Sequence, residues 1–171
     1  MGLEDFGVIL RPAQPLLASL MECELLVYGF VTSGGTGLPH QFTYVLSDGS
    51  KNIEAMLKRD SDNDALVSYL SIRYAICQPE AATQVFLGVV TQVAAKFCLQ
   101  ITGMAPGVEF SCDSLDEFQE YAAEKVRQAK SRWSSLFAGD TEEVVVSVAE
   151  SWKYFIAKHP EVVQSKRVLV G

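Results

Sequence analysis

The chain is poor in the residues from which metal and nucleophile sites are most often built. Its 171 residues include only two histidines and four cysteines. The cysteines, which are Cys23, Cys77, Cys98 and Cys112, lie far apart and form no C-x-x-C pair. Zinc sites usually bring their ligands in closely spaced pairs. We therefore expect no metal site and no cofactor, and we interpret all four cysteines as reduced side chains of the core.

The chain also lacks the segments that would target it to a membrane. Its most apolar stretch, residues 81–95, is interrupted by Gly88 and by four polar side chains, and it is too short to cross a bilayer. The first residues have neither the basic region nor the long apolar region of a signal peptide. Position six is Phe6, whereas a myristoylation motif needs Ser or Thr there. These features predict a cytoplasmic protein without a membrane contact of its own.

Positive charge is scarce as well. There are 14 Lys and Arg residues against 21 Asp and Glu residues, so the formal net charge is -7. An acidic surface repels phosphate backbones and anionic lipids, which argues against nucleic-acid and membrane partners. The 49% hydrophobic and 20% charged shares are those of an ordinary globular protein. We expect one globular domain over residues 1–171, in which residues 161–171 form either a tail or a short edge strand.

Most of the chain shows strand or helix periodicity. Stretches rich in β-branched and aromatic residues, or alternating in polarity, predict strands; they are Phe6–Leu10, Leu25–Thr32, Gln41–Leu46, Leu66–Ile76, Cys98–Thr102 and a short edge strand at Val108–Ser111. Apolar residues at helical spacing predict helices that begin near Pro15 and Pro79, and a short one over Ile53–Leu57.

Two amphipathic helices are predicted at the C-terminal end. Ser114 and Glu117 have the spacing of a capping box, and Gly139 would end that helix. Residues 140–143 form a second such box, and His159–Pro160 would end the last helix. Together the elements predict a single domain of the α+β class, or of the α/β class, with a mixed or antiparallel β-sheet packed with helices.

Two loops could contact a protein partner. The segment Gly34–Gly37 leads into a strand and not into a helix, so a flexible hairpin tip explains it better than a phosphate cradle. We expect Gly35 and the neighbouring His40 to be available to a partner at this tip. The second loop carries Asp60, Asp62 and Asp64.

These three aspartates copy the first ligands of a calcium loop. However, Ala65 stands where such a loop needs Gly, and Ser71 stands where it needs Glu. We therefore rank a solvated acidic loop, or a contact patch for a basic partner, above a calcium site.

Arg73 is a charged residue in the middle of an apolar strand pattern. If its face of the sheet is covered, the guanidinium must be paired with a carboxylate, and a structural ion pair is the role that we prefer. Nothing in the sequence has the spacing of a hydrolase signature. We predict no catalytic residue, although a site that joins Arg73, His40 and an acid in space would indicate an enzyme or a small-ligand binder.

The run from Tyr69 to Ile76, the apolar helix predicted after it and the low pI of about 4.8 together resemble small bacterial toxin-immunity proteins. The resemblance implies a non-catalytic inhibitor that neutralises a cognate, basic effector or toxin domain by one-to-one binding. It implies no specific binding residue.

An acidic secretion or assembly chaperone is the alternative. Such chaperones usually open with a helix, whereas this chain is predicted to open with a strand. Oligomeric state separates the two classes, because the chaperone would be a homodimer and an immunity protein is often a monomer.

Overall fold

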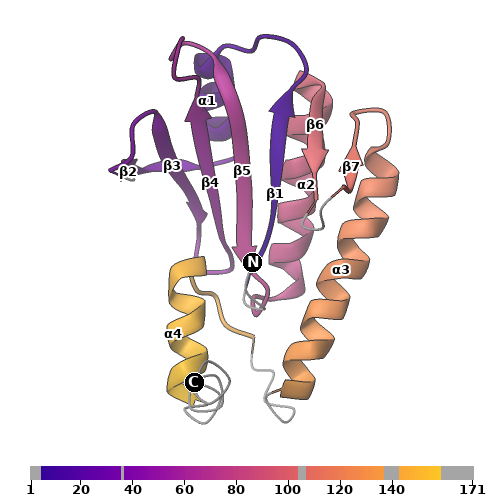
Figure 1. Cartoon of the computed structure of the whole chain (residues 1–171). Helices are drawn as coiled ribbons and strands as arrows, with labels where there is room; N and C mark the ends of the chain where they lie inside the picture. The colour runs from indigo at the N-terminus through magenta and orange to yellow at the C-terminus, as the bar shows by residue number, and fades with distance from the viewer. Residues whose placement is uncertain (1–4, 36, 104–106, 137–142, 159–171) are drawn as a thin grey trace, which may run out of the picture.

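The computed structural model describes residues 5–35, 37–103, 107–136 and 143–158. Seven strands form one antiparallel sheet with the order β2-β3-β4-β5-β1-β6-β7 (Figure 1). The predicted α+β class is therefore confirmed. Residues 161–171, for which a tail or an edge strand was predicted, lie outside the described residues. The elements are β1 (Asp5–Pro12), α1 (Ala18–Val27), β2 (Val31–Gly35), β3 (Gln41–Ser47), β4 (Asn52–Arg59), β5 (Val67–Ala75), α2 (Glu80–Phe97), β6 (Leu99–Thr102), β7 (Glu109–Phe110), α3 (Leu115–Leu136) and α4 (Val148–Lys158).

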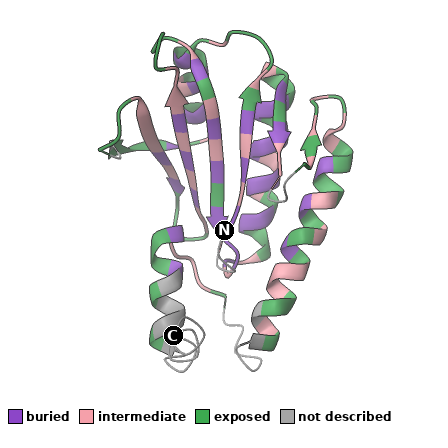
Figure 2. Ribbon diagram, viewed as in Figure 1, coloured by how far each residue is buried: buried purple, intermediate pink, exposed green. Residues whose placement is uncertain are grey.

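The core lies between one face of the sheet and the helices α1 and α2. Strand residues alternate between buried and more exposed positions, as the banded strands of Figure 2 show, because successive side chains point to opposite faces. On the buried face, the ring of Phe86 from α2 lies 5.7 Å from Phe6 and 4.8 Å from Tyr74. The hydroxyl groups of Tyr74 and Thr83 are 2.9 Å apart and share a hydrogen bond. Aromatic packing thus fixes α2 on the central strands.

Helix α3 extends this layer beyond the edge strand β7. Its buried face consists of Phe118, Ala122 and Val126, which recur at helical spacing. The ring of Phe110 from β7 lies 5.6 Å from that of Phe118. At the start of the helix, the Ser114 hydroxyl accepts a hydrogen bond from the N–H of Ser111 at 3.0 Å, in place of the predicted capping box.

Strand β4 replaces the short helix predicted over Ile53–Leu57. Ile53, Ala55 and Leu57 are buried, whereas the residues between them are less so. This period of two residues suits a strand that is hydrogen-bonded on both sides, and β4 pairs with β3 and with β5. The helix prediction, which rested on the i, i+3, i+4 spacing of Ile53, Met56 and Leu57, was therefore wrong.

The prediction of a strand over Leu25–Thr32 was wrong in its first half. Residues 25–27 belong to α1, and β2 begins at Val31. The helix ends in a Schellman motif, in which Gly29 has a φ of 91° and Phe30 N–H donates to the carbonyl of Leu25 at 3.0 Å. The leucine and valine residues at the end of α1 have the composition of a strand, so composition alone does not separate α1 from β2. Gly29, at which the helix ends, marks the boundary between the two elements.

Helix α4 begins later than predicted. Residues 140–142 of the second predicted capping box, like Gly139 and His159–Pro160, lie outside the described residues. The helix starts at Val148, where Ser147 and Glu150 form a capping box: Glu150 N–H donates to the Ser147 hydroxyl at 3.2 Å, and Ser147 N–H donates to the Glu150 carboxylate at 3.4 Å. Before it, Val144 N–H donates to the carbonyl of Cys77 at 3.0 Å. β-Branched residues thus cross the end of the sheet before the helix starts.

Two of the four cysteines are joined, which corrects the expectation that all are reduced. Cys98 and Cys112 form a disulfide, with their Cα atoms 5.1 Å apart. The physical reason is the antiparallel pairing of β6 with β7, since Cys98 comes just before β6 and Cys112 comes shortly after β7. Cys23 is free and exposed, and Cys77 is free and partly buried.

Candidate functional site

The residues predicted to contact a partner come together at one end of the sheet. This end holds the tip between β2 and β3, with Gly35 and His40, and the loop between β4 and β5, with its three aspartates. The two loops are joined through the backbone, because Arg59 N–H donates to the His40 carbonyl at 2.8 Å. The Lys58 ammonium also donates to the carbonyl of Pro39 at 3.0 Å.

The loop of residues 60–66, which we call the acidic loop, is held by its own side chains. The Asp60 carboxylate accepts the N–H groups of Asp62 at 2.8 Å and of Asn63 at 3.1 Å. The Asn63 side chain accepts the N–H of Ala65 at 3.2 Å. These are the local turns that Asp and Asn favour. Asp60 therefore shapes the loop through one oxygen of its carboxylate.

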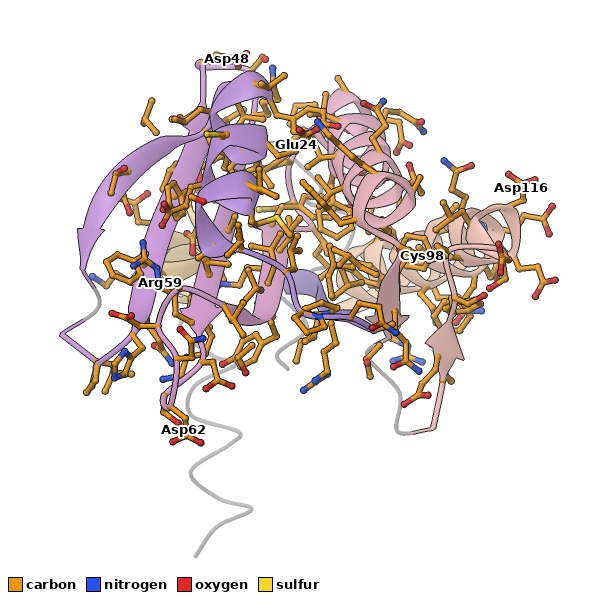
Figure 3. The ribbon with its side chains drawn as sticks, turned by 90° about the horizontal axis from the view of Figure 1, so that it is seen from above. Glu24, Asp48, Arg59, Asp62, Cys98 and Asp116 are labelled. Carbon is orange, nitrogen blue, oxygen red and sulfur yellow. A yellow bond between two sulfur atoms is a disulfide. The ribbon has the colours of Figure 1, made fainter. Side chains whose placement is uncertain are left out.

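Asp62 and Asp64 are the carboxylates that the acidic loop presents to solvent. Both residues are exposed, and neither takes part in the ion pairs found among the described residues. Figure 3, which views the molecule from this end, shows Asp62 pointing outward at the rim. An exposed carboxylate pair on a turn fixed by hydrogen bonds is suited to meeting a cationic surface.

Arg59 anchors the base of the acidic loop. Its guanidinium forms an ion pair with Glu22 of α1 and lies 4.4 Å from the centre of the Phe42 ring. Burial, followed by the nearby Glu22 carboxylate, raises the pKa of Tyr44 to about 12, which keeps this hydroxyl neutral. Sequence reasoning missed Arg59 because it assigned Ile53–Leu57 to a helix. Once the segment is taken as a strand, the same alternation places Arg59 on the inward face, where a cation needs a partner.

The tip between β2 and β3 is more regular than expected. Ser33, Gly34 and Gly35 belong to β2, with an irregularity of register between Thr32 and Gly34. Gly34 has a φ of 102° with open space around it, which is the conformation that a glycine at such an irregularity allows. His40 also has a positive φ of 60° as the chain enters β3.

Arg73 lies away from these loops. Its Nε and Nη2 donate to the same oxygen of Glu54 at 3.2 and 3.0 Å, and the other oxygen of Glu54 accepts the N–H of Val148 at the start of α4 at 3.1 Å. In the register of the sheet, Arg73 is opposite Glu54, whereas His40 precedes the pair of Gln41 and Lys58. Four residues of strand separate the two levels, or roughly 13 Å. The arrangement of Arg73, His40 and an acid that would have indicated an enzyme is therefore not formed.

Two further observations concern metal binding and membrane insertion. Over the described parts of the chain, no group of three or more His, Cys, Asp or Glu side chains is arranged to hold a metal ion. None of the helices in those parts has the length and apolar character needed to cross a membrane.

A second acidic group lies at the same end of the molecule. Helix α3 carries Asp116 and Glu117 in its first turn, and Asp116 points outward on the side of Figure 3 away from Asp62. Acids in a first helical turn are stabilised by the helix dipole, so this group has a structural explanation of its own.

Comparison of the chain with protein-family models, with curated proteins and with solved structures found no match.

Proposed function

We propose that this protein is a non-catalytic binding module of the immunity or inhibitor type, which neutralises a basic bacterial effector or toxin domain by one-to-one binding. The observation that carries the proposal is the acidic loop, where Asp62 and Asp64 project from a turn fixed by Asp60 and Asn63. Because the turn is already ordered, little conformational entropy is lost when a partner binds.

The charge of the whole chain supports the same proposal. A net charge of -7 attracts a cationic partner over long range, and such steering raises association rates by roughly 10- to 1,000-fold at low salt. Asp62 and Asp64 then make the local contact. Gly35 and His40, on the adjoining tip, lie where a partner on the acidic loop would reach them.

The test is affinity capture from the native cell extract at low and at high salt, with wild type and with Asp62→Asn/Asp64→Asn. We expect wild type to retain one stoichiometric basic protein, and the variant to retain it at least tenfold less, because two charges that face the partner are lost. The control is Glu117→Gln/Glu120→Gln, which removes the same charge from exposed positions of α3.

The captured protein is then purified and its activity titrated with the chain. Loss of that activity at one equivalent supports inhibition. Equal capture by the wild type and the acidic-loop variant, or no partner at any salt concentration, contradicts the proposal.

An acidic secretion or assembly chaperone is the second candidate. The observation that favours it is the exposed apolar side of α1, where Leu20, Leu26 and Val27 are 51%, 57% and 77% exposed. A chaperone would hold its client without inhibiting an activity, so the titration above distinguishes the two candidates.

A further inference from the structure

The disulfide between Cys98 and Cys112 closes one end of a short hairpin. Cys98 comes directly before β6, and Cys112 is the second residue after β7. At the other end of the hairpin the chain itself joins the two strands, and there Gly103 N–H donates to the Val108 carbonyl at 3.0 Å. The redox state of the two cysteines therefore decides whether β7 is held to β6 at both ends or at one end.

Strand β7 has a short pairing with β6. It consists of Glu109 and Phe110, which pair with Thr102 and Ile101 of β6. The Gln100 side-chain amide also donates to the Glu109 carboxylate at 2.7 Å, in a contact that is exposed to water. Hydrogen bonds of this kind have a modest net strength, because water replaces them when they break. The covalent link is therefore an important part of what keeps β7 on β6.

Helix α3 depends less on the disulfide. Phe118, Ala122 and Val126 of this helix are buried in the core, and burial of apolar side chains is the main source of stability. The ring of Phe110 lies 5.6 Å from that of Phe118, so β7 also contacts the helix. Loss of the disulfide should therefore separate β7 from β6 first, while β7 stays on α3 and α3 stays on the core.

Cys98 is the more accessible of the two cysteines. Cys98, labelled in Figure 3, is exposed, whereas Cys112 is half-buried. Cys98 also ends α2 in the left-handed conformation, with a φ of 49° and a ψ of 53°. Glycine is the usual residue there, because a side chain is disfavoured in that conformation, so the sulfur and not the backbone explains a cysteine at this position. Exposed disulfides are the ones that thiols reduce most readily.

The other two cysteines are free, and Cys23 is exposed. In compartments that oxidise thiols, an exposed cysteine is usually paired. In compartments that keep thiols reduced, a disulfide is usually transient and serves catalysis or redox sensing. A chain that combines an exposed free thiol with an accessible disulfide fits the second case.

We propose that Cys98–Cys112 is a redox-active disulfide, which a dithiol reductant opens in the folded protein so that β7 separates from β6. One thiolate of the dithiol attacks Cys98 Sγ and expels Cys112 as a thiolate, which takes up a proton. The second thiolate of the dithiol attacks the resulting mixed disulfide at the reductant's own sulfur and releases Cys98, which is protonated in turn. The dithiol leaves as a disulfide, having given two electrons to the protein. In the reduced protein β6 becomes the edge strand of the sheet.

The first experiment measures reduction of the folded Cys23→Ser variant by dithiothreitol without denaturant. Samples are quenched in acid, unfolded and alkylated, and the alkylated cysteines are identified by mass spectrometry. Cys77 should be alkylated from the start, and Cys98 and Cys112 should appear with time. We expect a rate proportional to the dithiothreitol concentration and nearly independent of urea below the unfolding transition, because the reagent attacks the folded state. A rate that rises steeply with urea shows that global unfolding must come first, and it overturns the proposal.

The second experiment compares the oxidised and reduced proteins in a short pulse of deuterium. In the reduced protein, we expect Gly103 and residues 107–114 to exchange roughly tenfold faster or more, while α2 and β5 stay protected during the pulse. Cys98→Gly removes the link and suits the left-handed backbone, so without reductant it should match the reduced wild type. Cys112→Ser repeats this test with the backbone at Cys98 unaltered. The control is Cys23→Ser, which keeps the link and should respond to the reductant as wild type does.

Two results of the deuterium pulse overturn the proposal. Unchanged exchange in the reduced protein shows that β7 stays paired with β6 without the link. Loss of protection over α2 and β5 within the same pulse shows that the disulfide supports the whole fold. The proposal does not rest on the proposed function, because failure to capture a partner on the acidic loop would leave both measurements as they are.

Discussion

Replacing Glu54 by alanine tests whether strand β4 holds the start of α4. One oxygen of this carboxylate accepts the N–H of Val148, the first residue of α4, and the other accepts two N–H groups of Arg73. The side chain of Glu54 is 14% exposed, whereas that of Arg73 is 49% exposed. Two different interactions therefore meet at one carboxylate.

The two interactions differ in expected strength. Val148 is buried, and a buried N–H that loses its acceptor costs about 1–3 kcal/mol. A carboxylate at a helix N-terminus contributes about 0.3–1 kcal/mol more. The pair with the half-exposed Arg73 is screened by water and contributes about 0.2–1 kcal/mol. We expect Glu54→Ala to lower the free energy of unfolding by about 2–4 kcal/mol and Arg73→Ala by about 1 kcal/mol or less.

Urea unfolding of the two variants and of Glu54→Gln measures these differences. Glutamine keeps a side-chain oxygen for Val148 N–H, so its loss should be closer to that of Arg73→Ala than to that of Glu54→Ala. Hydrogen exchange adds a local readout, since the first turn of α4 should lose protection in Glu54→Ala alone. If Arg73→Ala and Glu54→Ala cost the same, the ion pair and not the helix contact is the stabilising element, and the reasoning is wrong.

Three more predictions concern single groups. The hydrogen bond from Lys51, and then that from Ser50, hold the pKa of Asp48 below its usual value of about 3.9. The ionised Asp48 carboxylate therefore stabilises the folded state fully above about pH 4, and this contribution is lost as the pH falls further. The urea midpoints of wild type and Asp48→Asn should differ at pH 7 and converge in acid, and a difference that stays constant with pH would contradict this. Burial raises the pKa of the Cys77 thiol to about 11, so at pH 8 a thiol reagent should rapidly label only the exposed Cys23 of the native protein. The variant Cys23→Ser should not be labelled rapidly, and rapid labelling of it would show that Cys77 is accessible to the reagent. Reduction of the Cys98–Cys112 disulfide, which closes a loop with a sequence separation of 14, should lower the free energy of unfolding by about 3 kcal/mol. The same reducing agent should not change the stability of Cys98→Ser/Cys112→Ser. Four free thiols in the denatured, unreduced wild type would show that no disulfide is present, as the sequence-based expectation has it.

Sequence periodicity predicted the elements whose surroundings are uniform along their length. Strand β5 alternates from Leu70 to Tyr74 because one face is buried over that length, and the alternation breaks near Val67, where the pairing with β4 shifts register. Helix α2 has a wide apolar side because it lies on the sheet over its whole length. In both elements the burial pattern repeats regularly along consecutive residues, so the local sequence periodicity was enough to predict them.

The wrong predictions concern either a segment whose residues fit more than one periodicity or a feature whose cause lies in a distant part of the sequence. Ile53, Met56 and Leu57 have helical spacing, whereas Ile53, Ala55 and Leu57 alternate as in a strand. The partner strands that decide between the two are separate segments of the chain. The disulfide depends on the pairing of β6 with β7, which spacing alone does not reveal. The same holds for the candidate site. Asp60, Asp62 and Asp64 could be read as a loop, but only the fold shows that Asp60 is used within the turn and that His40 adjoins it.

The place of β1 in the sheet has a consequence for the order of folding. The first strand lies in the interior of the sheet, with Leu10 opposite both Leu70 of β5 and Ile101 of β6. During synthesis it therefore waits for β5 to emerge before either of its edges is paired, whereas the β2–β5 meander and the β6–β7 pair form from neighbouring segments. Such long-range closures slow folding. The insertion of β1 between β5 and β6 should be the late step that joins the meander to β6 and β7, so the chain stays aggregation-prone until β1 is in place.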